Sequence, residues 1–367
     1  MKQKSGSKSK NIQVGRDFHK NWFMKQESGN NSENLQAGRD IYYGISATEC
    51  RQIALDIFKA NFYEFSEKAL KIANKRVEEI TDEFIKDFFK DNLNKVEKLE
   101  NPSIQSSLFN MQKEYAKTGG EQLKERLVLL LKNRINSEER SLEQICFDES
   151  IKIIPKITND QINILSFLFC TRTFSNGSLT SLGKFDNFLN FLTTLIPKEL
   201  PSNSFFSHLS YVGCISNIEG HKQSKQLEEI LKNLYTALFV KGFTQEELMN
   251  EFDIDILKIN KLIILCAHDK SKYQFKFLSN TNFKKDYQNS EYKNLISKIT
   301  NFQDKYVMKN HEIKSYVISR NKNMINVFNF WNHEEFKSIK LTSVGITIAI
   351  INYNIGYNEN LKFTPFI

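Results

Sequence analysis

Hydrophobic residues recur at helical spacing along most of the chain, and this pattern predicts a mainly α-helical protein. Residues 48–100 contain neither proline nor glycine, and apolar residues return every three or four positions from Phe58 to Leu99. The segment therefore predicts one long helix or two helices placed end to end, a length found in stalks and bundles. Asn101 and Pro102 end it, because the residue before a proline avoids the helical conformation.

Shorter helical segments follow, and brief polar turns separate them. The spacing predicts helices near residues 103–117, 121–133, 137–154, 179–196, 204–213, 223–241, 254–267, 290–306 and 311–330. Thr158 and Thr244 each stand where a helix cap is expected, and Glu247 completes a capping box with Thr244. Strand-like segments lie at 273–278 and 337–341, and residues 341–352 resemble a strand that leads into a helix capped by Thr342 or Ser343.

The first 44 residues are polar and contain one 16-residue sequence twice, at an offset of 23 residues. The copies are QKSGSKSKNIQVGRDF at 3–18 and QESGNNSENLQAGRDI at 26–41, identical at nine positions. Each copy contains an alternating segment suited to a short strand, 11–14 and 34–37, and a glycine follows each segment. Without the repeat, the same composition would indicate a disordered polar tail.

Stacking the two copies in register gives the repeat a physical role. Amide side chains that lie over one another form hydrogen-bonded ladders. Two rungs are too few for a self-sufficient solenoid, which needs about three repeats, so we predict that copies of the chain complete the stack as a trimer or higher homo-oligomer. The predicted oligomerisation residues are the paired amides, the corner glycines and the neighbouring charges: Asn11, Gln13, Gly15, Arg16, Asp17, Asn34, Gln36, Gly38, Arg39 and Asp40.

Length and composition suggest several domains. The chain has 367 residues, with 14 glycines and five prolines, which favours helices over a turn-rich β fold. We predict a mainly α protein with a short β-repeat arm, solenoid- or prism-like, at 1–44. A domain at 45–155 would contain the long helix and a helical bundle. A mainly helical C-terminal domain would span 156–367, in which the 341–352 helix and the two strand-like segments form winged-helix-like α+β elements.

The net charge of +8 is unevenly distributed. Residues 269–340 carry 14 Lys and Arg against seven Asp and Glu, and residues 1–44 carry eight against four. A basic C-terminal region is suited to phosphate backbones, although a solvated basic surface explains the same charge. The residues predicted for contact with nucleic acid are Lys284, Lys285, Arg320 and Lys322.

The cysteines and the hydropathy of the chain indicate its cellular compartment. Five cysteines lie far apart without a C-x-x-C pair, which indicates buried thiols in a reducing environment. The polar N-terminus lacks a secretory apolar segment, and the apolar run at 344–351 is too short to cross a bilayer. We therefore expect a cytoplasmic protein without a membrane span.

Catalytic motifs are missing from the sequence. There is no Walker A loop, no G-x-G-x-x-G, no G-x-S-x-G elbow and no H-E-x-x-H pair. We therefore predict no catalytic residue, metal or cofactor, and an enzyme with an unfamiliar site is the remaining alternative.

Two resemblances suggest a biological role. The S-G-x-x-S-x-N-x-Q-x-G-R-D-[IF] motif, present twice, resembles N-terminal motifs of bacterial proteins encoded near anti-phage and conflict systems. More loosely, it resembles the paired repeats of amyloid-signalling motifs in immune proteins. The segments TNDQINILSFLF (158–169), HLSYVGCI (208–215) and LTSVGITIAI (341–350) resemble a family of uncharacterised bacterial proteins and are similar to abortive-infection alpha proteins.

These resemblances imply phage defence, with a phage or host protein as the trigger, and they bring no catalytic residues. The first functional hypothesis is an oligomerising defence protein. The alternative is a winged-helix regulator that binds nucleic acid through residues 269–340.

Overall fold

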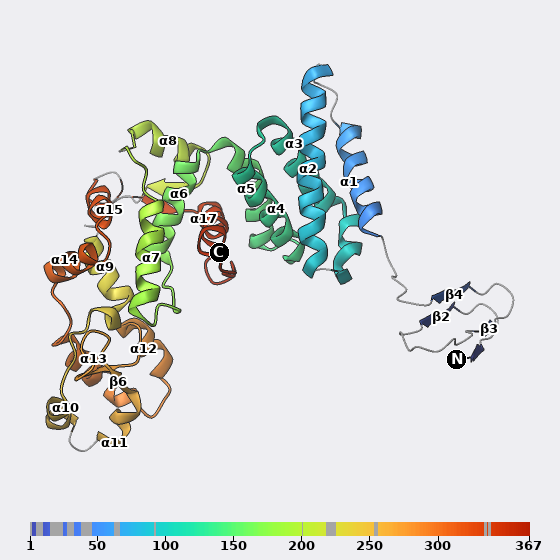
Figure 1. The fold of residues 1–367 in the computed structure, drawn as a ribbon. Helices are drawn as coiled ribbons and strands as arrows, with labels where there is room; N and C mark the ends of the chain where they lie inside the picture. Colours follow the sequence, from blue (N-terminus) through green and yellow to red (C-terminus); the bar gives the residue numbers. More distant parts are fainter. Residues whose placement is uncertain are drawn as a thin grey trace. The chain divides into compact units, whose positions relative to one another are not determined.

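Helices dominate the computed structural model, and the strands among its described residues form two-stranded pairs (Figure 1). The structure describes residues 2–4, 10–14, 25–27, 33–37, 46–61, 67–91, 93–199, 201–217, 225–252, 256–333, 336 and 339–367. The prediction of a mainly α protein is confirmed. The chain divides into two units, Met1–Ala116 and Lys117–Ile367. This division does not follow the predicted boundary at 155.

The helices of the first unit are α1 (Ala47–Asn61), α2 (Glu67–Asp91), the 3₁₀ helix η1 (Leu93–Glu100) and α3 (Pro102–Thr118). α1 packs beside α2 (Figure 1), where Leu55 and Phe58 share an apolar cluster with Val77. On the polar side, Arg51 Nε donates to Asp82 Oδ1 at 2.5 Å. The predicted single or end-to-end helix over 48–100 is therefore wrong.

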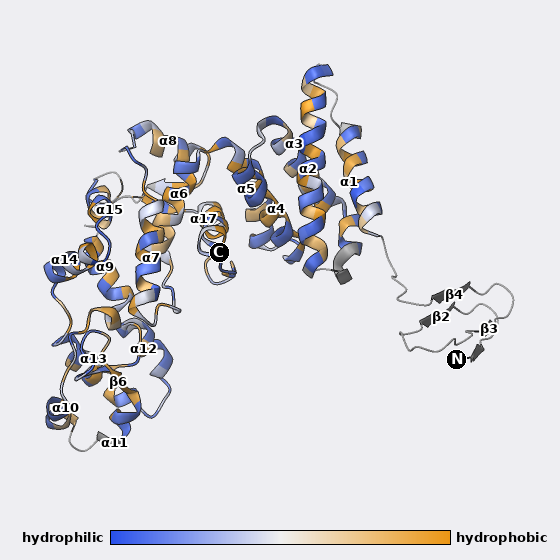
Figure 2. Cartoon of the chain, in the orientation of Figure 1, coloured by the Kyte–Doolittle hydropathy of each residue, from blue (hydrophilic) through white to orange (hydrophobic). Residues whose placement is uncertain are grey.

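The reason for this correction lies in the amphipathic pattern of both helices, whose hydrophobic and hydrophilic residues alternate along their length (Figure 2). Two helices with one apolar face each bury more apolar surface side by side than end to end. Gln112 of α3 adds a polar tie, because its Nε2 donates to Thr81 Oγ1 at 3.0 Å and to the Ala54 carbonyl at 3.1 Å.

The second unit is built around α17 (Ser343–Tyr357), which is buried on every side over residues 347–354. It packs against α4 (Glu121–Asn136), α5 (Leu142–Ile153) and α6 (Asn159–Leu168). The predicted caps are confirmed here: Thr158 forms a capping box with Gln161, and Thr342 accepts from the Gly345 N–H. Because α4 and α5 pack on α17, they belong with the C-terminal helices rather than with a 45–155 domain.

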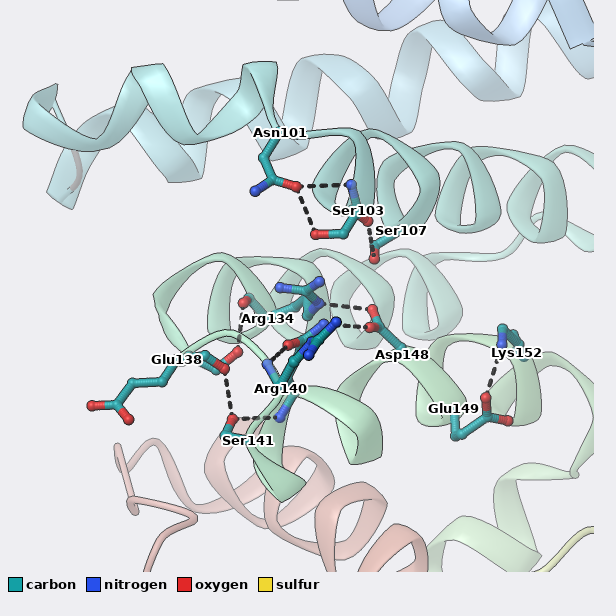
Figure 3. A network of polar contacts seen from close by, with 12 residues as sticks. Asn101, Ser103, Ser107, Arg134, Glu138, Arg140, Ser141, Asp148, Glu149 and Lys152 are labelled. Atoms are coloured by element: carbon teal, nitrogen blue, oxygen red, sulfur yellow. Dashed lines mark hydrogen bonds and ion pairs between the residues drawn. The ribbon is translucent and has the colours of Figure 1, made fainter.

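A polar network fixes the turn between α4 and α5 (Figure 3). The Arg134 side chain is buried, and its Nε donates to Asp148 Oδ1 at 2.8 Å. Ser141 caps α5 by accepting from the Gln144 N–H, and its own hydroxyl donates to the Glu138 carbonyl. A buried guanidinium is thus matched with a carboxylate on the neighbouring helix.

A π-helical turn, η3 (Phe169–Thr173), follows α6. It carries Arg172, whose guanidinium stacks on the Trp331 and Phe336 rings and donates to the carbonyls of Phe336 and Ile339. Burial lowers the pKa of Arg172 to about 10. Arg172 therefore anchors the chain before the last helix to the end of α6.

Further helices among the described residues of this part are α7 (Leu182–Thr194), α8 (Asn203–Tyr211), α9 (Leu227–Leu234), α14 (Asn310–Arg320) and α15 (Met324–Trp331). The predicted helix at 223–241 is shorter, since α9 gives way to the 3₁₀ helix η4 (Thr236–Phe239). The predicted helix at 311–330 is two helices, with Asn321 in an extended conformation between them.

A second aromatic core lies between α10 (Gln245–Phe252), α11 (Ile256–Ile259), α12 (Asn280–Tyr287) and α13 (Ile296–Asp304). Phe243, Phe275 and Phe302 meet there with ring centroids 5.0–6.4 Å apart. The capping box of Thr244 and Glu247 is confirmed at α10. The predicted helix over 254–267 is wrong beyond the 3₁₀ helix η6 (Asn260–Leu262), because the next residues form a strand.

That strand, β6 (Ile263–Leu265), pairs antiparallel with β7 (Tyr273–Phe275). The other antiparallel pair joins β5 (Ile215–Asn217) to β8 (Ile339–Leu341). The two predicted strand segments thus belong to different sheets and do not pair with each other, as a wing formed from both would require. No helix among the described residues combines the length and hydrophobicity needed to cross a membrane.

Candidate functional site

The backbone of the repeat arm forms two short parallel sheets. β1 (Lys2–Lys4) pairs with β3 (Lys25–Glu27), and β2 (Lys10–Val14) pairs with β4 (Glu33–Ala37). Every pair joins residues 23 positions apart, which is the offset of the repeat. Identical amide residues lie opposite each other: Gln3 with Gln26, Asn11 with Asn34 and Gln13 with Gln36.

The edges of these sheets are open within the described residues, because each sheet has two strands. An unpaired strand edge presents a row of backbone donors and acceptors to a further strand. Four predicted oligomerisation residues, Asn11, Gln13, Asn34 and Gln36, thus lie on paired strands. The other six lie outside the described residues: Gly15, Arg16, Asp17, Gly38, Arg39 and Asp40.

The predicted nucleic-acid contacts lie on separate elements. Lys284 and Lys285 are exposed on α12, and Lys322 is exposed in the turn after α14. Arg320 is engaged elsewhere, because its guanidinium pairs with Asp186 of α7 through Nε at 2.6 Å and through Nη2. The structure therefore leaves three of the four cations unpaired among the described residues.

Sequence reasoning missed a lysine-lined groove of about 650 Å³. Lys225 and Lys232 line it at α9, Lys309 lines it before α14, and Asp304 is the acidic residue in its lining. Asn280 also lines it and begins α12, the helix that carries Lys284 and Lys285. Lys225 and Lys232 escaped notice because they precede the basic 269–340 segment.

The three family-like motifs meet in one place. Gln161 of the first motif lies 3.1 Å from His208 Nδ1 of the second. Thr342 of the third caps α17 and donates its hydroxyl to the Gly213 carbonyl at 2.6 Å. The L-T-x-x-G and H-L-S-Y-V-G-C-I sequences thus form a structural joint, at which β8 pairs with β5 before α17 begins.

Gly345 completes this joint. A Cβ atom there would lie 2.9 Å from the Cys214 carbonyl carbon and closer still to its oxygen. Such a separation is below van der Waals contact, so only glycine fits. The motif therefore encodes close packing of α17 on the turn that precedes β5.

The nucleophilic side chains of this unit are deeply buried. Burial raises the pKa of the Cys170 thiol far above its usual range, and that of Cys214 to about 12. Both thiols are therefore uncharged near neutral pH and are poor nucleophiles. All five cysteines are free and buried, as predicted. Within the described ranges, no group of three or more His, Cys, Asp or Glu residues is arranged to hold a metal ion.

The model of an uncharacterised family matches residues 44–367 and so begins directly after the two repeats. No curated protein and no solved structure matches the chain.

Proposed function

We propose that this chain, which belongs through residues 44–367 to an uncharacterised protein family, is a non-enzymatic protein that assembles with its own copies through the N-terminal repeats. The observation that carries the proposal is the parallel, in-register pairing of β2 with β4. Asn11 lies opposite Asn34 and Gln13 opposite Gln36, the arrangement in which amide side chains form ladders. A repeat from another chain offers the same row of amides.

Assembly between chains follows from the small size of the arm. Two rungs bury too little apolar surface to stand alone, and a parallel sheet of two strands is marginal without further strands. Open edges supply the place where strands of other chains add. A trimer or a higher homo-oligomer supplies both the missing repeats and the strands that pair with the open edges.

The family match begins at residue 44, so the repeats precede the family region as a separate module. We infer that the arm gathers copies of the helical region. The resemblance to abortive-infection alpha proteins and to motifs near conflict systems supports an anti-phage role, with a phage or host protein as trigger.

Co-capture of two tagged copies tests the assembly proposal. Two full-length copies with different affinity tags, expressed together, are expected to purify with each other because their arms share one stack. Copies that consist of residues 45–367 serve as the matched control and are expected to purify apart. Equal co-capture of both forms would place the association in the helical region and contradict the proposal.

The lysine-lined groove favours a second candidate, a nucleic-acid-binding regulator. Lys225, Lys232 and Lys309 line the groove, and Lys284 and Lys285 are exposed on α12, which begins at its edge. Phosphate contacts by lysine depend strongly on salt, because binding releases counterions.

If this candidate holds, the K284Q/K285Q variant should bind duplex DNA more weakly. The slope of the logarithm of its binding constant against the logarithm of the salt concentration should fall in magnitude by about 2. Fluorescence anisotropy against salt concentration measures both. A K68Q/K75Q variant removes the same charge from exposed positions on α2 and should bind like the unchanged chain. Absence of DNA binding at low salt would exclude this candidate.

A further inference from the structure

A second pocket, of about 510 Å³, lies where α4 and α6 begin. Gly120 is the N-cap of α4 with φ 101°, and no side chain caps that helix. The first N–H groups of an α-helix lack partners within the helix and carry partial positive charge. A Cβ atom built on Gly120 would meet nothing within 4 Å, so the space before the helix is open.

Arg126 lines the same pocket from the second turn of α4. It is only 7% exposed. Its Nε and Nη2 donate to Asn352 Oδ1 at 3.2 and 2.9 Å, and its Nη1 donates to Asn159 Oδ1 at 2.7 Å. A guanidinium has five N–H groups, so two of them lack an acceptor within the described part of the chain.

The acceptors of Arg126 are neutral amides, and no carboxylate of the described residues lies within ion-pair distance of it. Arg134, the other buried arginine of α4, pairs with Asp148 instead. Burial lowers the pKa of Arg126, since desolvation disfavours its charged form. A buried charge without a counter-charge is costly. The Arg126 pocket therefore differs from the Arg134 site, where a carboxylate compensates the buried guanidinium.

The rest of the lining does not neutralise this charge. Glu121 is its acidic residue, but that side chain is 79% exposed and pairs with Lys124 at 2.7 Å. Asn159 is the first residue of α6, so a second helix N-terminus also borders the pocket. A buried guanidinium and the uncapped N-terminus of α4 therefore border one open space, beside the N-terminus of α6 that Thr158 caps.

We propose that this pocket binds a phosphate-class oxyanion, which accepts from the free N–H groups of Arg126 and from the first turn of α4. Charge-assisted bonds from guanidinium and backbone N–H groups suit such an oxyanion. The anion is inorganic phosphate or the phosphate of a small monoester. This site is independent of the assembly role of the arm.

Thermal unfolding of the full-length chain tests the proposal. Sodium phosphate or AMP is added, and sodium chloride at matched ionic strength provides the reference. Binding at ten times Kd should raise Tm by roughly 3–5 °C above that reference. A larger effect of phosphate assigns the free anion, whereas a larger effect of AMP assigns a monoester.

The Q122E variant separates binding from folding. Gln122 is exposed in the first turn of α4 and lines the pocket, where a carboxylate favours the helix but repels an anion. This variant should fold at least as stably as the unchanged chain and lose the response to both ligands. K156Q removes an exposed positive charge next to the lining residue Pro155 and should keep the response. No response of the unchanged chain, or an undiminished response of Q122E, would overturn the proposal and leave Arg126 as a tie between helices.

Discussion

Gly345→Ala is expected to lower the free energy of unfolding by about 3 kcal/mol. The added methyl group would lie 2.9 Å from the Cys214 carbonyl carbon and closer to its oxygen. Because the neighbour is backbone, no side-chain rotation relieves the contact. α17 would have to move away from β5, and the hydrogen bond from the Thr342 hydroxyl to the Gly213 carbonyl would break with it.

Helix propensity alone predicts that this substitution raises the free energy of unfolding, since alanine is favoured over glycine in a helix by about 1 kcal/mol. Gly183→Ala is the matched control, because Gly183 lies in α7 and a Cβ atom there meets nothing within 4 Å. That variant is expected to be neutral or stabilised by about 0.5–1 kcal/mol. Urea unfolding measures both variants, and similar stability of the two would contradict the joint described for the L-T-x-x-G motif.

Local signals in the sequence predicted local structure well. The Thr158 cap, the Thr244 capping box and the Thr342 cap lie where their spacing indicated. These caps depend on contacts within four residues, so a short sequence pattern is sufficient to predict them. The 341–352 segment likewise indicated a strand that leads into a helix, and β8 and α17 lie there.

The sequence pattern did not predict contacts between residues that are far apart in the chain. The pattern at 48–100 gave helical periodicity but not the fold-back of α1 on α2. Residues 263–265 looked helical, yet they pair with β7, because cross-strand partners outweigh a weak local preference. Arg126 gave no signal at all, since only the fold shows that its acceptors are amides from α6 and α17.

The same contrast between local features and distant contacts applies to the candidate site. The repeat and its offset were visible in the sequence, and the pairing of β2 with β4 shares that offset. The role of the basic region was less predictable. Arg320 is held by Asp186, which lies 134 residues earlier in the chain, and two groove lysines precede the basic segment.

The largest expected effect on assembly comes from proline in the paired strands. Gln13 and Gln36 occupy equivalent positions of β2 and β4. Proline has no N–H and a fixed φ, so Gln13→Pro with Gln36→Pro removes a ladder hydrogen-bond donor from each strand and interrupts any stack between chains. The double variant is expected to be a single chain in solution.

Threonine at both positions is the matched control. It favours strands but lacks the amide, so it retains the backbone pairing and removes the side-chain ladder. Gln13→Thr with Gln36→Thr should still form oligomers at high protein concentration and dissociate more readily on dilution. Neither pair of substitutions touches the helical region, so thermal unfolding of the helices should be unchanged in both.

The most direct test of assembly through the repeats is therefore the mass in solution, measured by light scattering on the unchanged chain and on the double-proline variant at the same concentrations. We expect at least three chains per particle for the unchanged protein and one chain for the variant. The same number of chains per particle in both would contradict assembly through the repeats.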